Sequence, residues 1–68
     1  MAQGVVKWFD PKKGYGFITA DGQPDIFVHW RNIKGDDPFK TLEDGESVEF
    51  EIIQGAKGLA AENVVRLS

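Results

Sequence analysis

Apolar and polar residues alternate with a period of two over three short segments of the chain. In residues 15–20 the odd positions carry two aromatic rings and a threonine, and the even positions carry small or aliphatic residues. In residues 25–29 aspartate, phenylalanine and histidine alternate with isoleucine and valine. In residues 48–53 valine, phenylalanine and isoleucine alternate with two glutamates and a second isoleucine. A period of two places alternate side chains on opposite faces of a β-strand, so these segments are predicted to be strands.

Glycine, proline and aspartate divide the chain into short pieces. They occur at residues 11–14, 21–24 and 55–58, where they are typical of β-turns and hairpin loops. No segment sustains helical periodicity over three turns, and the one helical turn that we consider lies near residues 31–34, in the long connection at 31–46. We predict strands at residues 4–10, 15–20, 25–30, 47–54 and 59–67.

Five short strands in 68 residues would leave a flat open sheet wet on both faces. Closure into a small barrel buries one face and removes most free strand edges, so we predict an all-β closed barrel. Alternation alone does not separate an oligonucleotide-binding barrel from an SH3-like one. It also leaves two pairs of neighbours open: Val64 and Val65 compete for the interior, and a local twist or bulge would bring Trp8 and Phe9 to one edge.

Size, cysteine content and charge limit the classes of function. With 68 residues the chain is long enough for one small domain, which we place at residues 1–68. The absence of cysteine excludes disulfides and thiolate metal sites. A formal charge of −3 argues against a protein that coats DNA through phosphate contacts alone.

The distribution of charge is more informative than the sum. Residues 1–34 hold five basic and three acidic side chains, whereas residues 35–68 hold three basic and eight acidic ones. Six of the eight aromatic residues also lie before residue 35. Basic and aromatic side chains are therefore concentrated in the same half of the chain, as expected for a surface that binds nucleic acid.

A row of rings is expected on the outer surface of the second and third strands. If the aliphatic residues of these strands build the core, Tyr15, Phe17, Phe27 and His29 lie on the opposite face. Exposed rings stack on bases, nearby lysines meet phosphates, and a carboxylate accepts hydrogen bonds from base amines. The alternative is a second small core beneath residues 31–46, but it would place the neighbouring charges in a dry interior.

Two local motifs are the most specific indications of nucleic-acid binding in the sequence. The run Lys-Gly-Tyr-Gly-Phe-Ile at residues 13–18 is similar to the first ribonucleoprotein motif, in which glycines leave room for a base beside stacking rings. The run Asp-Ile-Phe-Val-His-Trp at residues 25–30 looks like the second. A pair of glycines at a barrel corner is the structural alternative for the first run.

Together with Lys-Trp-Phe at residues 7–9 and Phe-Lys-Thr-Leu at residues 39–42, these motifs resemble the cold-shock domain, as found in bacterial cold-shock proteins. The resemblance runs from residue 4 to residue 64, with four motifs in the right order and spacing. It implies a small closed five-stranded antiparallel barrel of the oligonucleotide-binding (OB) type. It also implies binding of single-stranded RNA and single-stranded DNA, and a role as an RNA chaperone that discourages secondary structure, with effects on transcription or translation in a cold-shock response.

Carried over residue by residue, the resemblance predicts a nucleic-acid-binding surface. Its members are Lys7, Trp8, Lys13, Tyr15, Phe17, Asp25, Phe27, His29, Trp30 and Phe39, with Phe9 at its edge and Arg31 and Lys57 as further basic contacts. Tyr15 and Trp30 stand where the family often has phenylalanine, and both still stack. Asp10 replaces a common asparagine, and residues 59 and 60 (Leu and Ala) stand where proline and glutamine are frequent, which puts a contact from that loop in doubt.

Other classes of function have weaker support. His29 is the only histidine, so it lacks partners for zinc or a catalytic triad, and no paired acid and base or nucleophile appears. The acidic residues at 43–51 lack the spacing of a calcium loop and are expected to form a solvated face. We therefore expect no enzyme activity, no metal and no cofactor.

A protein-interaction module is the remaining alternative. An SH3-like barrel uses similar rings as a groove for proline-rich segments, often beside acidic loops, and Asp36 and Asp37 supply acidic charge here. The lysines at positions 7, 12 and 13 disfavour it. The sequence contains no apolar run long enough to cross a bilayer, so we expect no membrane contact. A chain without cysteine fits the cytoplasm, and a small closed barrel is expected to be a monomer with no obligate protein partner.

Overall fold

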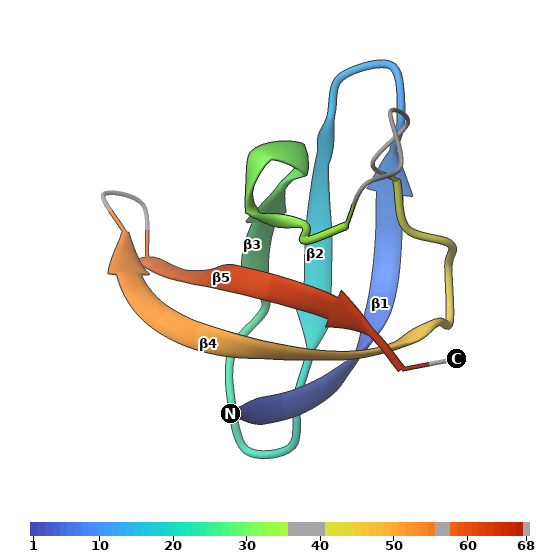
Figure 1. Ribbon diagram of the computed structural model, residues 1–68. Helices are drawn as coiled ribbons and strands as arrows, with labels where there is room; N and C mark the ends of the chain where they lie inside the picture. Colours follow the sequence, from blue (N-terminus) through green and yellow to red (C-terminus); the bar gives the residue numbers. More distant parts are fainter. Residues whose placement is uncertain (36–40, 56–57, 68) are drawn as a thin grey trace.

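The computed structural model describes residues 1–35, 41–55 and 58–67. It contains the strands β1 (Ala2–Asp10), β2 (Tyr15–Thr19), β3 (Ile26–His29), β4 (Ser47–Gly55) and β5 (Gly58–Arg66), and the 3₁₀ turn η1 (Trp30–Asn32), as Figure 1 shows. The five predicted strands are confirmed to within two residues at each end. The helical turn begins at Trp30, one residue before the position that the sequence indicated.

The strands close into a barrel in the order β1-β2-β3-β5-β4, which confirms the predicted closed barrel. Four of the junctions are antiparallel, but β3 and β5 pair in parallel, with Phe27 beside Ala60. The predicted antiparallel barrel is confirmed, with one parallel pairing at this junction. The reason is geometric: a ring with an odd number of strands cannot reverse direction at every junction, so one pair must be parallel.

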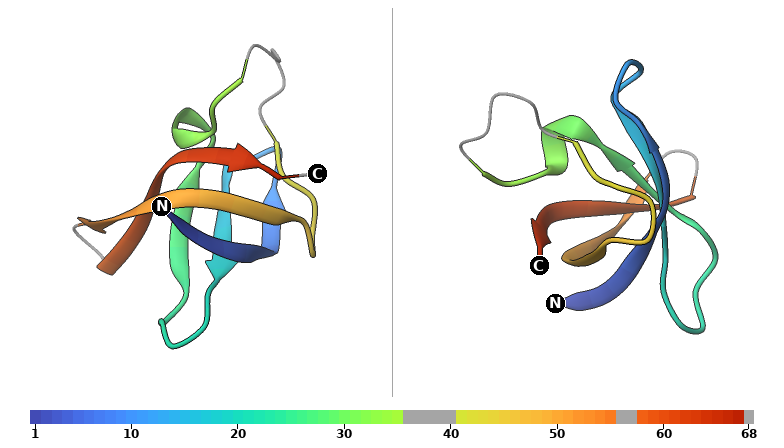
Figure 2. Two further views of the ribbon diagram at one scale, coloured as in Figure 1. Left: turned by 60° about the horizontal axis from the view of Figure 1, so that its bottom comes forward. Right: turned by 90° about the vertical axis from the view of Figure 1, so that its right-hand side faces the viewer.

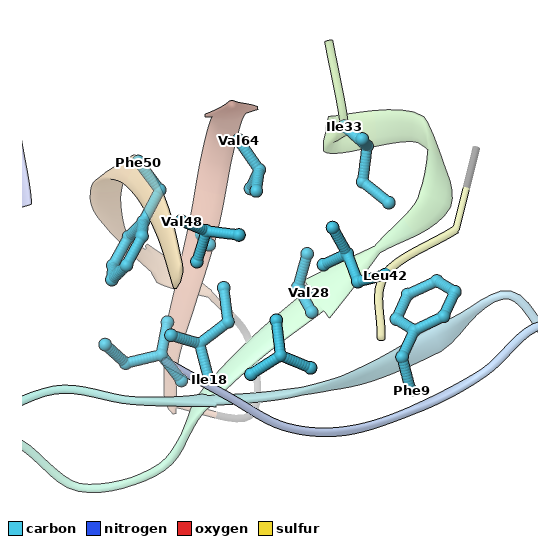
Figure 3. Packing of buried hydrophobic residues seen from close by; sticks show 11 residues of the cluster. Phe9, Ile18, Val28, Ile33, Leu42, Val48, Phe50 and Val64 are labelled. Carbon is cyan, nitrogen blue, oxygen red and sulfur yellow. The ribbon is translucent and has the colours of Figure 1, made fainter. Parts of the chain in front are cut away.

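The hydrophobic core fills the space between two groups of strands. β4 and β5 cross the direction of β1, β2 and β3 at a steep angle (Figures 1 and 2). Inward side chains from both groups meet between them, together with Ile33 and Leu42 from the long connection (Figure 3). The buried cluster comprises Val6, Phe9, Ile18, Ile26, Val28, Ile33, Leu42, Val48, Phe50, Ala61 and Val64.

A bulge in β1 decides which side of the barrel its residues occupy. Val6 pairs with Ile18 and Trp8 pairs with Phe17, so Lys7 is an extra residue without a partner in the ladder. As a result Lys7 and Trp8 both lie outside, whereas Phe9 points inward and is only 7% exposed. Contrary to the expectation from the sequence, the bulge lies at Lys7 and does not bring Trp8 and Phe9 to one edge. Placing Phe9 at the edge of the binding surface is therefore wrong, because alternation resumes after Trp8 and turns Phe9 into the core.

The structure also shows which of the two adjacent valines of β5 faces the core. Val64 is fully buried and Val65 is 37% exposed. Asn63, just before them, has a left-handed φ of 54°, and the ladder between β4 and β5 shifts register between Glu49 and Glu51. The irregularity separates the buried Ala61 from the buried Val64 by three residues instead of two.

Glutamate 46 departs from the solvated acidic face that the sequence suggested. Its side chain is 6% exposed, and one carboxylate oxygen accepts a hydrogen bond from Nε of Arg66 at 2.6 Å. The other oxygen accepts from the backbone N–H of Glu43 at 3.2 Å. This carboxylate therefore ties the turn before β4 to the end of β5.

Gly16 allows β1 and β2 to approach closely. A Cβ atom at this position would collide with the carbonyl oxygen of Trp8 and would lie 2.7 Å from Cα of Phe9. Both groups belong to the backbone of β1, so neither can rotate away as a flexible side chain would. The second glycine of the motif at residues 13–18 is thus required by strand packing.

We expect Gly16→Ala to lower the free energy of unfolding by about 1–3 kcal/mol or more, because the added methyl group forces the two strands apart. Urea unfolding followed by circular dichroism measures this loss. Gln54→Ala, on an exposed position of β4, serves as the control and should stay within about 0.5 kcal/mol of the wild type. An equal stability of the Gly16→Ala variant and the wild type would contradict the packing described for Gly16.

Candidate functional site

Cross-strand pairing brings aromatic side chains side by side on the outer surface of β1, β2 and β3. Trp8 is the partner of Phe17, and Phe17 is in turn the partner of Phe27 on β3. In the next row Tyr15 is the partner of His29. Since all of these side chains point away from the core, the register of three strands assembles a surface from residues that are far apart in the sequence.

Four of the rings form a closed cluster. Trp8 lies 5.4 Å from Phe17 and 5.9 Å from Tyr15, and Phe27 lies 5.8 Å from Phe17 and 5.7 Å from Tyr15, between ring centroids. Three of these contacts are edge to face and one is stacked, which are the arrangements that aromatic quadrupoles favour. Each of the four rings is half-buried and therefore keeps part of its surface in contact with solvent, which a dry second core would not allow.

Trp30 extends this surface beyond the end of β3. Its backbone N–H donates to the carbonyl of Gly14 at 2.8 Å, and its ring lies against Gly14, where a Cβ atom would clash with it. The indole ring is 42% exposed and lies 5.7 Å from the ring of His29. We call the surface formed by Trp8, Tyr15, Phe17, Phe27, His29 and Trp30 the aromatic face.

His29 also helps to fix η1. Its Nδ1 atom accepts a hydrogen bond from the backbone N–H of Arg31 at 3.3 Å, so it caps the turn that carries Trp30. An accepting Nδ1 leaves the proton of the neutral ring on Nε2. The guanidinium of Arg31 lies over the Trp30 ring, 5.5 Å from its centroid, in a cation–π contact.

Charged groups border the aromatic face at both ends. At one end Nζ of Lys7 forms an ion pair with Asp25 at 2.9 Å, and both side chains are about half exposed. At the other end Oδ1 of Asp10 accepts hydrogen bonds from the backbone N–H groups of Lys12 and Lys13, at 2.9 and 3.3 Å. Asp10 therefore holds the basic loop before β2 in place.

A groove lies beside the aromatic face, where β3 meets the hairpin of β4 and β5. Its volume is about 870 Å³, and it is lined by Tyr15, Phe17, Pro24, Asp25, Phe27, Asn32, Gly55, Gly58, Leu59 and Ala60. Sequence reasoning missed Pro24 and Asn32 and doubted the segment at 59–60. The groove lies at the parallel pairing of β3 with β5, and nothing in the sequence indicated which two strands would pair in parallel.

The structure thus brings together most of the predicted site residues. Ten of them, Lys7, Trp8, Lys13, Tyr15, Phe17, Asp25, Phe27, His29, Trp30 and Arg31, lie on or around the aromatic face. Phe9 is excluded because it is in the core. Phe39 and Lys57 lie outside the described residues. Within the described ranges no three His, Asp or Glu side chains gather as metal ligands would.

Comparison with known sequences identifies the family. The 'Cold-shock' DNA-binding domain matches residues 2–67, which is almost the whole chain. The chain belongs to this family. The cold-shock domain is a nucleic-acid-binding domain, and the exposed rings of β1, β2 and β3 are consistent with that role.

Similar bacterial proteins extend over the same length. The chain is 55% identical over 67 residues to cold shock protein CspB of Bacillus caldolyticus, which covers 98% of this chain and 100% of that protein. It is 52% identical over 67 residues to cold shock protein CspA of Staphylococcus haemolyticus, with the same coverage. These similarities support the family assignment independently of the fold.

The fold itself has a counterpart among solved structures. A structure titled "drosophila Unr CSD456" superposes with a TM-score of 0.75 at 24% sequence identity, covering 98% of this chain and 26% of that one. At this identity the likeness concerns the fold, and it confirms the OB-type barrel. In the described part of the cold-shock domain no helix is long and apolar enough to cross a membrane.

Asp10 gives a test of the site's local geometry. We expect Asp10→Ala to lower the free energy of unfolding by about 1 kcal/mol, because it removes the acceptor of two backbone N–H groups. Asp10→Asn keeps an acceptor oxygen and should lose less. Thermal or urea unfolding compares the two variants, and equal losses would show that the side-chain acceptor does not hold the loop.

Proposed function

We propose that this cold-shock domain binds single-stranded RNA and single-stranded DNA by stacking bases on the aromatic face. The observation that carries the proposal is the exposed, mutually supported set of rings on β1, β2, β3 and η1. Exposed apolar surface that is gathered into one patch on a small protein typically marks a binding site. Bases supply what such rings need, because every base has a flat π-face.

Several stacking positions in a row give useful affinity with little sequence preference. Each stacked base is worth roughly 1–3 kcal/mol by alanine substitution, and part of this gain is offset by ordering the strand. The rings hold no pattern of donors and acceptors that would read a base edge at each position, so we propose a mild preference among bases. Duplex nucleic acid binds poorly, because its bases are already stacked on each other.

Polar groups at the border of the face complete the proposed site. Lysines and Arg31 neutralise phosphates, and Asp25 offers an acceptor to base amines. Phe39 and Lys57 remain proposed members of the site on the strength of the sequence. Phe9 contributes from the core, by supporting β1 behind Trp8.

Binding of unpaired strands explains a chaperone role without catalysis. A protein that binds only the open form of an RNA hairpin shifts the hairpin toward melting by mass action, and no nucleotide hydrolysis is needed. We propose that the domain is a non-enzymatic RNA chaperone that acts as a monomer in the cytoplasm, and that it affects transcription and translation, including in a cold-shock response.

Tryptophan fluorescence offers a direct test, because Trp8 and Trp30 both lie on the aromatic face. We expect saturable quenching on titration with short oligo-dT or oligo-U, because stacked bases contact the indole rings. A matched duplex and a proline-rich peptide serve as controls. Silence with both single strands and a response to the peptide would assign the face to protein interaction instead.

A single substitution tests the stacking mechanism. We expect Phe17→Ala to weaken binding of oligo-dT by about five- to 150-fold, which corresponds to the loss of one stacked base. Val65→Ala removes exposed apolar surface from β5, away from the aromatic face, and should leave the Kd unchanged. Circular dichroism establishes that both variants are folded. A Phe17→Ala variant that binds as tightly as the wild type would refute stacking at this ring.

A further inference from the structure

Two cations are in direct contact with side chains of the proposed binding site, and their electrostatic surroundings differ. Lys7 forms an ion pair with Asp25 at 2.9 Å, so the local charge of the pair is zero. Arg31 lies over Trp30, and among the described residues it has no carboxylate partner. Of these two cations, Arg31 is therefore the one whose charge is not compensated by a carboxylate among the described residues.

The ion pair limits what Lys7 can give to a phosphate. An exposed pair of this kind is weak by itself, so a phosphate is able to compete for the ammonium group. The carboxylate of Asp25 remains beside it, however, and repels the phosphate that approaches. Because Asp25 stays next to Lys7, the pair brings no net positive charge to the phosphate, and it neutralises the backbone less than an unpaired cation would.

Arg31 is held in a position that suits phosphate binding. The turn η1 is anchored by the hydrogen bond from Trp30 to Gly14 and by the cap that His29 provides. A guanidinium over an aromatic ring keeps its N–H donors available, because they lie in the plane of the group. A base stacked on the neighbouring rings therefore brings its phosphate close to a cation that is already oriented.

We propose that Arg31, oriented by Trp30, is the principal phosphate contact of the aromatic face, and that Lys7 contributes little to the salt dependence of binding. The inference rests on the proposed function and specifies how the same site holds the sugar-phosphate backbone. It assigns phosphate binding to Arg31, a role that the stacking rings do not supply.

The salt dependence of binding tests this assignment, with the Kd for fluorescein-labelled oligo-dT measured by anisotropy from about 50 to about 200 mM salt. With about two to four phosphate contacts, the wild type should show a log–log slope of about −1.5 to −3. Arg31→Gln should make the slope shallower by about 0.7, so that its Kd rises about two- to threefold less over this range.

Three further variants separate a local contact from net charge. Arg31→Lys keeps the charge and should keep the wild-type slope. The double variant Lys7→Gln with Asp25→Asn removes the ion pair at no change in net charge, and its slope should equal that of the wild type whatever its Kd. Lys34→Gln removes an exposed charge just beyond η1 and is matched to Arg31→Gln in net charge.

The outcomes distinguish the two proposals. An unchanged slope in Arg31→Gln, an equal reduction in Lys34→Gln, or a shallower slope in the double variant overturns the role of Arg31 and leaves stacking intact. Failure of the wild type to bind any single strand overturns the proposed function and the role of Arg31 with it. Thermal unfolding establishes that each variant is folded before its slope is interpreted.

Discussion

The close approach of β1 and β2 at Gly16 is the contact on which the rest of the surface depends. No side chain fits at Gly16, because the backbone of Trp8 and Phe9 occupies the space that a Cβ atom would need. This contact fixes the register next to the bulge at Lys7, which turns Trp8 outward and Phe9 inward. Ordinary alternation after the bulge then places Trp8 on the aromatic face and Phe9 in the core.

The rings of the aromatic face are partly exposed to solvent and are nevertheless held in fixed orientations by their contacts with each other. Four rings shield each other through edge and stacked contacts at 5.4–5.9 Å, and such contacts are worth about 0.5–1.5 kcal/mol each beyond the area that they bury. The rings are therefore oriented before a ligand arrives. Preorganisation of this kind reduces the entropy that binding must overcome, so affinity does not require a large interface.

The distribution of charge fits the proposed stacking of bases better than a general attraction for polyanions. The acidic second half of the sequence gives the chain a net charge of −3, which lowers its attraction for polyanions at long range. Near the rings, Lys7 is compensated by Asp25, while Asp10 uses its carboxylate to organise the loop of Lys12 and Lys13. A binder of this design should depend on salt less than one held mainly by lysines.

The sequence by itself determined the five strands, the closed barrel and the outward position of Tyr15, Phe17 and Phe27, because period-two alternation reports directly which face of a strand is buried. It did not determine the position of Phe9, since a bulge of one residue inverts every later side chain and depends on contacts with another strand. The parallel pairing of β3 with β5, the groove beside it and the pairing of Lys7 with Asp25 were also decided only by the tertiary structure. Each of these joins residues that are distant in the chain, and their distance in space follows from how the barrel closes, which no local pattern encodes.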